Sequence, residues 1–365
     1  MNWFDLGKNH VWLPYTQMGM NPEQLEVESA SGVTIKLKDG REIIDGISSW
    51  WSLAHGYNHP KIVEAIQKQA EKLSHIMFAG FAHEHSYKLA HNLAQITPKS
   101  LNKVFFSDSG SVAIEVAMKM SVQFFLNSQD SNKNKFISFQ NGYHGDTAGA
   151  MSLSDLECGM HKKFSKYLQK NFCLKLPEND NDLNYFDDFL QKNHHKIAGL
   201  IIEPLVQCAG GMKFHNADIL QKIYHITKKY DIIFIADECA TGFYRTGEIF
   251  AVNEANIVPD IICLSKALTG GHITLAATVC TDDIYNKFLH KSDLNMALMH
   301  GPTFMANPIS CAAANASMEL FQLSDYRLKV KNIESTLKKE LSKLTALPNV
   351  VDIRDDLKNL IVNYS

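Results

Sequence analysis

Short apolar runs alternate with longer helical patterns from about residue 60 to residue 280, and this alternation limits the fold more than any other feature of the chain. One helical segment, residues 217–230, places Leu220, Ile223, Tyr224 and Ile226 on one face. Strands that alternate with helices form mostly parallel sheets covered on both faces, and ligands bind beyond the carboxyl ends of such strands. We therefore predict an α/β fold with strands at residues 104–106, 136–139, 200–202, 232–235, 261–263 and 277–279.

The two ends of the chain differ from this central pattern. Residues 33–44 alternate between apolar and polar side chains around a turn at Asp39-Gly40, which predicts a β-hairpin. After Asn307 the chain becomes helical. We expect residues 1–49 to form an amino-terminal part of a small α+β domain, residues 50–320 to form the large α/β domain, and residues 321–365 to form the rest of the small domain, which looks incomplete.

Composition and charge exclude several functional classes. The 365 residues are 45% hydrophobic and 21% charged, as in ordinary soluble enzymes, and the net charge of −3 offers no basic surface for nucleic acid or an anionic membrane. The seven cysteines occur singly and without C-x-x-C, which predicts reduced thiols. No secretory signal or membrane-length apolar run is visible, so we expect a cytoplasmic protein.

Several common catalytic motifs are missing from the sequence. Residues 83–85 read His-Glu-His and lack the H-E-x-x-H spacing of a zinc site, so we expect no metal and a loop or helix start here. There is no G-x-S-x-G or Walker loop. A dinucleotide-dependent dehydrogenase is disfavoured because no G-x-G-x-x-G follows a first strand.

Lys266 and Asp237 each follow an apolar run of β type, where a buried strand would deliver them to a cleft. Such a pair suits pyridoxal 5'-phosphate (PLP), because the aldehyde of PLP needs an amine and its ring nitrogen needs an anion. For an isolated lysine, a solvated strand end would be the better interpretation. The neighbouring motifs favour the cofactor.

Three further strand ends carry candidate groups. Gly110 and Ser111 lie in a Ser/Gly-rich turn before a helix, where backbone N–H groups could hold a phosphate or Ser could simply cap the helix. Tyr143, between two glycines, could stack on a pyridine ring or pack on nearby loops. Glu203 could sit close to Asp237 and help to set the protonation of the cofactor, or merely cap a strand.

Aromatic residues gather near the amino terminus. Tyr15 follows Trp12, and Trp50 and Trp51 follow two serines. Such pairs usually belong to a core, but they could instead cover a flat or apolar substrate. Residues 300–304 form a tight turn whose hydroxyl could reach a phosphate or only reverse the chain.

Taken together, these motifs resemble the fold type I PLP enzymes of the class III (ω-type) aminotransferase group. The resemblance extends nearly from residue 10 to residue 350. The segments that carry it are residues 12–16, 50–51, 108–111, 142–145, 266–271 and 300–305.

The resemblance implies a role for each candidate residue. Lys266 would bind the cofactor covalently and then move a proton, Asp237 would pair with the ring nitrogen, and Tyr143 would stack on the ring and touch substrate. The remaining roles are the phosphate contacts of Gly110 and Ser111, phosphate contacts from the partner subunit of a homodimer by Pro302 and Thr303, and a substrate site lined by Tyr15, Trp50, Trp51 and Gly301.

The resemblance also implies the reaction. S-adenosylmethionine would donate its amine to 8-amino-7-oxononanoate in biotin synthesis, in two half-reactions. Two alternatives stay open: another ω-aminotransferase that uses a diamine or ω-amino acid, and a PLP-binding remnant with impaired turnover.

Two departures from the family pattern bear on this expectation. Ser265 and Tyr244 occupy positions where we expect glycine, and their side chains could crowd the site or be accommodated. Relatives continue past the carboxyl end with a Gly-rich strand and an arginine that binds the keto-acid carboxylate. Since none of the four arginines falls in such a segment (Arg41, Arg245, Arg327 and Arg354), we expect a shortened product with impaired substrate recognition and low solubility.

Overall fold

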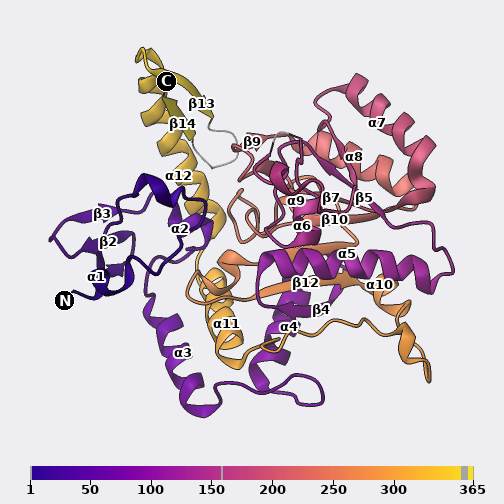
Figure 1. Cartoon of the computed structure of the whole chain (residues 1–365), viewed down its shortest axis with the longest axis horizontal. Coiled ribbons are helices and arrows are strands. Elements are labelled where there is room, and N and C mark those ends of the chain that lie inside the picture. The colour runs from indigo at the N-terminus through magenta and orange to yellow at the C-terminus, as the bar shows by residue number, and fades with distance from the viewer. Residues whose placement is uncertain (1, 158, 355–360, 365) are drawn as a thin grey trace.

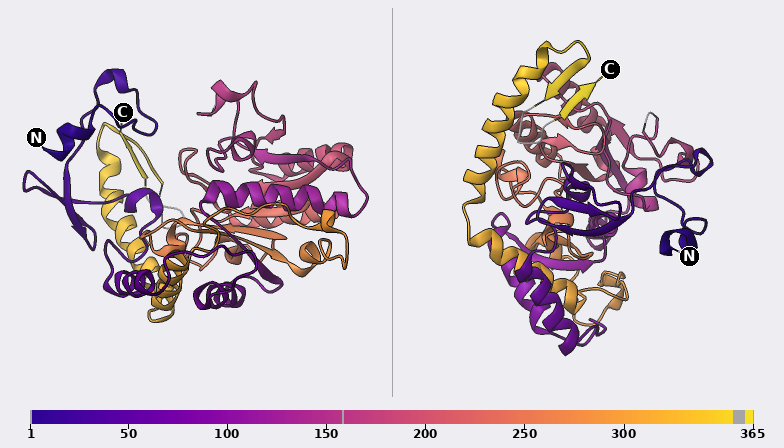
Figure 2. Two further views of the ribbon diagram at one scale, coloured as in Figure 1. Left: turned by 60° about the horizontal axis from the view of Figure 1, so that its bottom comes forward. Right: turned by 90° about the vertical axis from the view of Figure 1, so that its left-hand side faces the viewer.

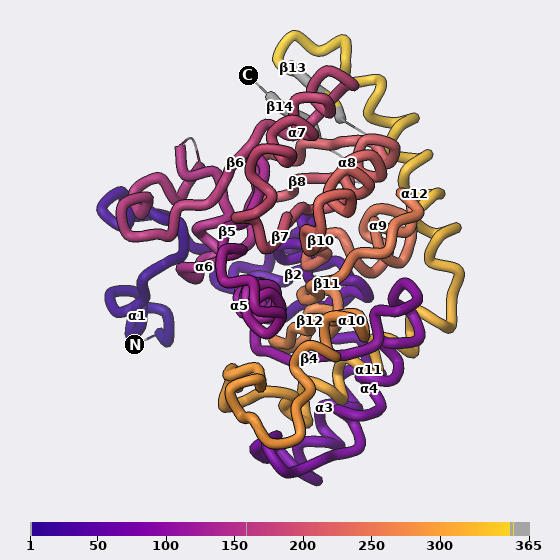
Figure 3. The backbone as a smooth tube through the Cα atoms, turned by 90° about the vertical axis from the view of Figure 1, so that its right-hand side faces the viewer, coloured from indigo at the N-terminus to yellow at the C-terminus, as the bar shows by residue number. Residues whose placement is uncertain are grey.

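A seven-stranded sheet forms the centre of the computed structural model, which describes residues 2–157, 159–354 and 361–364 (Figure 1). Figure 3 shows its strands in succession from β6 to β4. In spatial order they are β4 (Leu101–Ser107), β12 (Ala276–Thr281), β11 (Ile261–Leu264), β10 (Ile233–Asp237), β7 (Ile197–Ile202), β5 (Lys135–Phe139) and β6 (Phe172–Leu174).

The mostly parallel sheet predicted from the sequence is confirmed, and each of the six predicted strands is present. Neighbouring strands from β11 through β10, β7 and β5 to β6 run parallel, whereas β12 is antiparallel to both β11 and β4. The sequence analysis missed β6, a half-buried edge strand of only three residues. Strands buried on both faces produce long apolar runs, and a short edge strand does not.

Helices cover both faces of the sheet (Figure 2). Along β10 the side chains alternate: Phe234 and Ala236 join one core, and Ile233 and Ile235 join the other. The first core contains residues of α4 (Glu84–Ile96), α7 (Asp180–Asn193), α8 (Ala217–Lys229) and α11 (Pro308–Gln322). The second contains residues of α5 (Gly110–Asn127), α6 (Ala148–Ser152) and α10 (Asp282–Asn286).

Segments from both ends of the chain lie to one side of this sheet (Figure 1). The predicted hairpin is confirmed as β2 (Thr34–Leu37) and β3 (Glu42–Ile44), and β1 (Val27–Ser31) pairs with β2. The helical pattern predicted after Asn307 corresponds to α11 and to α12 (Tyr326–Leu341). Helix α12 is followed by β13 (Val350–Arg354) and β14 (Ile361–Tyr364), which pair antiparallel.

The domain boundaries after residues 49 and 320 stay a prediction. Part of the carboxyl-terminal segment on which the expectation of a shortened product rests, residues 355–360 and 365, lies outside the described residues. We expected a loop or a helix start at residues 83–85, and the structure shows a helix start: Glu84 is the first residue of α4 and His83 caps it. The other main elements are α1 (Trp3–Gly7), α2 (Ser48–Trp51), α3 (Pro60–Lys72), α9 (Ala251–Glu254), β8 (Val206–Gln207) and β9 (Lys213–Phe214).

Within the described ranges, we find no helix with the length and apolar character needed to cross a membrane.

Candidate active site

A cavity of about 430 Å³ opens at the carboxyl ends of the parallel strands. It brings together most of the residues that the sequence analysis selected, and they come from five strand ends and two amino-terminal segments. The predicted residues in its lining are Tyr15, Trp50, Trp51, Gly110, Ser111, Tyr143, Glu203, Asp237 and Lys266.

Three predicted residues do not join this lining. Gly301, Pro302 and Thr303 belong to a loop that leads into α11. Near this loop Lys119 of α5 donates from Nζ to the backbone oxygen of Met299, at 2.5 Å. The expectation that the loop serves the cavity of a partner subunit stays a prediction.

Lys266 follows β11 and begins the short helix η4 (Lys266–Thr269). Its φ of 47° lies in the left-handed region, which a non-glycine residue occupies at a cost of about 1–3 kcal/mol when the surroundings impose it. The preceding Ser265 is buried, and its hydroxyl donates to the backbone oxygen of Leu275 at 3.1 Å. The side chain of Ser265 is therefore accommodated, although it also lines the cavity.

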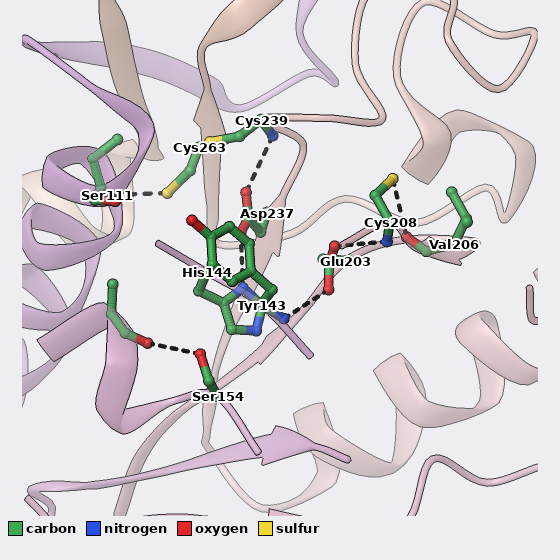
Figure 4. Close-up of polar contacts among 12 residues, drawn as sticks. Ser111, Tyr143, His144, Ser154, Glu203, Val206, Cys208, Asp237, Cys239 and Cys263 are labelled. Atoms are coloured by element: carbon green, nitrogen blue, oxygen red, sulfur yellow. Dashed lines mark hydrogen bonds and ion pairs between the residues drawn. The ribbon is translucent and has the colours of Figure 1, made fainter. Parts of the chain in front are cut away.

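Asp237 ends β10 and forms a buried pair with His144 (Figure 4). The Nδ1 atom of His144 lies 2.7 Å from Oδ2 of Asp237, and the backbone N–H of Cys239 donates to Oδ1 at 3.1 Å. Burial pushes the pKa of Asp237 upward, but the contacts with His144 and Cys239 and the charge of Lys266 together outweigh it, and the pKa is lowered. Asp237 is therefore held as an anion inside the cavity wall.

His144 is a site residue that the sequence analysis did not select. Its motif, Gly-Tyr-His-Gly, was interpreted only for the tyrosine. The side chain of His144 is nearly fully buried, as is that of Asp237. A buried carboxylate such as that of Asp237 needs a partner that can donate a hydrogen bond. That general rule was the available signal for a histidine in this motif.

Glu203, just after β7, connects two loops of the site (Figure 4). One carboxylate oxygen accepts from the N–H of Tyr143 at 3.1 Å, and the other accepts from the N–H of Cys208 at 3.0 Å. Burial raises the pKa of Glu203 to about 7, and the neighbouring charge of Asp237 adds to this effect.

The turn between β4 and α5 carries the predicted phosphate residues. Ser109 caps α5 by accepting from the N–H of Val112 at 3.4 Å, so the simpler interpretation of the motif holds for this serine. Gly110 and Ser111 nevertheless line the cavity, and the first N–H groups of a helix have no partner within it. A Cβ atom on Gly110 would lie 3.1 Å from Sγ of Cys239, so the turn packs closely against the residues that follow β10.

An aromatic rim borders the cavity. The hydroxyl of Tyr15 donates to Oδ2 of Asp146 at 2.5 Å and lies 3.2 Å from the hydroxyl of Tyr143. The ring of Tyr15 meets the ring of Trp50 edge to face at 5.9 Å. Desolvation is the main reason that the pKa values of both tyrosines are raised.

Trp50 and Trp51 sit on a left-handed turn that the sequence did not indicate. Residues 48–51 have φ values of 50°, 48°, 57° and 63°, and left-handed backbone costs about 1–2 kcal/mol per non-glycine residue. The carboxylate of Asp45 supports the turn by accepting from the N–H groups of Ile47 and Ser49 at 3.0 and 2.7 Å. The guanidinium of Arg245 donates to the backbone oxygen of Trp51 at 3.1 Å.

Tyr244 does not crowd the cavity. Its φ of 68° explains why glycine is expected at this position. The ring stacks on that of Tyr326 at 5.6 Å with an interplanar angle of 28°, and it packs on Phe321. The side chain is thus accommodated against α11 and α12, outside the lining of the cavity.

Comparison with known proteins gives this site its family. The sequence profile described as aminotransferase class-III matches residues 15–356, and the chain belongs to this family. It is 45% identical to the adenosylmethionine-8-amino-7-oxononanoate aminotransferase of Buchnera aphidicola subsp. Schizaphis graminum, over 94% of this chain and 81% of that protein. The enzyme of the same name from Corynebacterium glutamicum is 41% identical, over 96% and 83% of the two chains.

Solved structures agree with this placement. The crystal structure of the adenosylmethionine-8-amino-7-oxononanoate aminotransferase of Methanocaldococcus jannaschii superposes with a TM-score of 0.94 at 35% identity, over 99% of this chain and 83% of that one. An amine transaminase from an uncultivated Pseudomonas species, solved in its PLP-bound form, superposes with a TM-score of 0.87 at 27% identity, over 95% and 82%. The predicted fold type I architecture is confirmed.

Pyridoxal 5'-phosphate is the cofactor of class-III aminotransferases, and the residues of this cavity fit it. Lys266 supplies an amine, and it is the only lysine among the described residues that line the cavity. Asp237 supplies a buried anion, Gly110 and Ser111 supply a helix start, and Tyr143 supplies a flat ring.

Proposed function

We propose that this chain transfers the amine of S-adenosylmethionine to 8-amino-7-oxononanoate and so makes 7,8-diaminononanoate in biotin biosynthesis. The observation that carries the proposal is the cavity in which Lys266 shares one wall with the buried Asp237–His144 pair beneath an aromatic rim. Relatives at 41–45% identity that are named for this activity support the choice of substrates.

When bound, PLP supplies an aldehyde that reacts with amines and a pyridine ring that withdraws electrons once its nitrogen is protonated. Asp237 would pair with that nitrogen, because a carboxylate whose pKa is lowered favours a proton on its partner. His144 keeps Asp237 ionised through the contact of 2.7 Å. Lys266 would hold the cofactor through Nζ and, once released from it, would accept and return a proton at that atom.

The other residues bind and orient. Gly110 and Ser111 would take the phosphate at the start of α5, where the helix dipole and unpaired N–H groups favour an anion. Tyr143 would stack on the pyridine ring. Tyr15, Trp50 and Trp51 would cover the substrate and exclude water from the cavity.

We also propose a homodimer in the cytoplasm whose active sites lie at the subunit interface. The loop that contains Gly301, Pro302 and Thr303 carries exposed apolar side chains on both sides: Met299 is 76% exposed and Phe304 is 56% exposed. Apolar side chains that project from a loop in this way are suited to contact with a partner. In the dimer, Gly301 would line the partner's substrate site, and Pro302 and Thr303 would contact its phosphate.

A second candidate is an ω-aminotransferase with a diamine or ω-amino acid donor. Structures of amine and ω-transaminases superpose on this chain at 26–27% identity, so the fold alone does not select the donor. Donor choice separates the two candidates.

The test is a donor panel with the purified protein loaded with PLP. S-adenosylmethionine should convert the absorbance of the bound cofactor to that of its amine form, and 8-amino-7-oxononanoate should then yield a diamine detected by mass spectrometry. Conversion by ornithine, 4-aminobutyrate or alanine but not by S-adenosylmethionine would support the second candidate. Borohydride labelling of Lys266 with no response to any donor would identify a remnant that only binds the cofactor.

A further inference from the structure

His161 is a buried histidine outside the lining of the main cavity. Its side chain is 6% exposed, and Nε2 lies 3.0 Å from Oδ1 of Asp146. Because a carboxylate oxygen only accepts, the hydrogen bond is donated by His161. Among the described residues Nδ1 of His161 is buried and has no hydrogen-bond partner, so Asp146 is the polar contact that holds this ring.

Asp146 connects His161 to the rim of the cavity. Its second oxygen, Oδ2, accepts from the hydroxyl of Tyr15 at 2.5 Å, and its backbone N–H donates to Oγ of Ser111 at 3.0 Å. The hydroxyl of Tyr15 also lies 3.2 Å from that of Tyr143. One carboxylate thus joins a buried imidazole to a phenol that belongs to the amino-terminal segment.

The three residues of this connection differ in burial: His161 is buried, whereas Asp146 and Tyr15 are exposed. Tyr15 is 64% exposed and the side chain of Asp146 is 53% exposed, so water competes for both groups. A carboxylate is planar, so a partner that fixes one oxygen also fixes the direction of the other. His161 is the buried partner that can do this.

We infer that His161 is a positioning residue: it orients Asp146 so that Tyr15 is held over the cavity, where it sets substrate affinity. The substrate part of this inference rests on the proposed function. His161 acts through Asp146 and does not line the cavity in which the cofactor fits.

A purely packing role for His161 would rest on its ring. The imidazole stacks on the ring of Tyr143 with an interplanar angle of 26° and a centroid distance of 5.9 Å. Hydrogen bonds that involve an ionised group are stronger than neutral contacts of this kind. We therefore expect the position of Tyr15 to depend more on the hydrogen bond from His161 to Asp146 than on the stacking of His161 on Tyr143.

Two substitutions separate the ring from the donor. His161→Phe keeps a ring beside Tyr143 and removes the hydrogen bond, whereas His161→Gln removes the ring and keeps an N–H that can reach Asp146. In both variants and the unaltered protein, the rate of chymotryptic cleavage after Tyr15 is followed by mass spectrometry, with and without PLP. Cleavage after Trp12, whose side chain is already 86% exposed, is the internal control.

We expect His161→Phe to raise the cleavage rate at Tyr15 about tenfold relative to Trp12, since a hydrogen bond to a charged group is lost. His161→Gln should restore the slow rate. Equal rates in all three proteins, or a fast rate in the Gln variant and a slow one in the Phe variant, would overturn the inference.

Kinetics supply a second readout. His161→Phe should raise the KM for substrate about tenfold while kcat and the cofactor absorbance stay unchanged, and His161→Gln should again restore it. A fall in kcat with unchanged KM would contradict a positioning role. Because cleavage needs no substrate, it tests the inference even if S-adenosylmethionine proves not to be the donor.

Discussion

The two walls of the cavity differ in how they are built. The wall that faces the cofactor consists of strand ends whose polar groups are buried and paired, as in the contacts of Asp237 with His144 and of Glu203 with two backbone N–H groups. The rim consists of exposed aromatic residues on segments without sheet structure, with Tyr15 at 64% and Trp50 at 56% exposure.

This difference suggests a division of labour. Buried, fully paired groups are costly to move, so the cofactor wall is organised before any ligand arrives. Exposed side chains on irregular segments can adjust to two chemically different substrates in turn. Three substitutions test this division, from the largest expected effect to the smallest, and a fourth tests a buried carboxylate outside the lining of the cavity.

Lys266→Ala should abolish turnover, with a loss of at least about 10³-fold, because in the proposed function this residue bonds to the cofactor and moves the proton. Borohydride reduction followed by peptide mapping should label Lys266 in the unaltered protein and nothing in the variant. Lys192→Ala, on an exposed part of α7, is the control that should retain both label and activity. Labelling of another lysine in the variant would show that the cofactor bonds to a residue other than Lys266.

Asp237→Asn should weaken cofactor binding by about 10²-fold, since it leaves a buried imidazole and the pyridine nitrogen without an anion. The dissociation constant is measured from cofactor absorbance or fluorescence on titration. If Asp237→Asn weakened cofactor binding no more than Tyr15→Phe does, the two walls would not differ in the way we describe.

Tyr15→Phe should raise the KM for substrate about tenfold and leave the cofactor constant unchanged, because only a hydroxyl at the rim is removed. Steady-state kinetics and a cofactor titration measure the two quantities. Tyr167→Phe, at a tyrosine that is 74% exposed, should change neither. A higher dissociation constant for the cofactor in the Tyr15 variant would show that the rim also holds the cofactor.

Glu238→Gln should affect stability rather than activity. Burial is the main cause that raises the pKa of Glu238 from 4.5 to about 7, and its oxygens contact Thr241 and the N–H of Val252. A raised pKa stabilises the fold below pH 4.5, and this contribution is lost as the pH rises through about 7.

Glutamine cannot ionise; its Oε1 can accept from the N–H of Val252, and its Nε2 can donate to the hydroxyl of Thr241, which reverses that contact. The free energy of unfolding should therefore vary less with pH in the variant, by about 1.4 kcal/mol per pH unit between pH 4.5 and 7. Denaturant titrations across this range measure the slope. Identical slopes in the two proteins would show that Glu238 is ionised in the folded state.

Much of this molecule could be predicted from its sequence because the central strands are buried on both faces. Each predicted strand is an apolar run, and the topology of such strands places the residues that follow them at one edge. For this reason the strand-end residues that line the cavity could be selected from the sequence: Gly110, Tyr143, Glu203, Asp237 and Lys266. The antiparallel direction of β12 left no comparable pattern in the sequence.

The polar pairs could not be predicted in the same way. His144 and Asp237 are separated by 93 positions, and Tyr15 and Asp146 by 131, so no local spacing marks them. The left-handed turn at residues 48–51 contains no glycine, and glycine is the usual signal for positive φ. These features depend on tertiary contacts.

The position of β12 has a consequence for how the protein reaches its native state. The turn that we propose to hold the phosphate follows β4, and Lys266 follows β11. In the sheet β12 lies between these two strands, although it comes after both in the chain. Its register with β4 pairs Ala276 with Ser107, across a long span of sequence. Contacts this distant form slowly, so in a growing chain the two sides of the cavity come together only after synthesis has passed β12 and that strand has inserted.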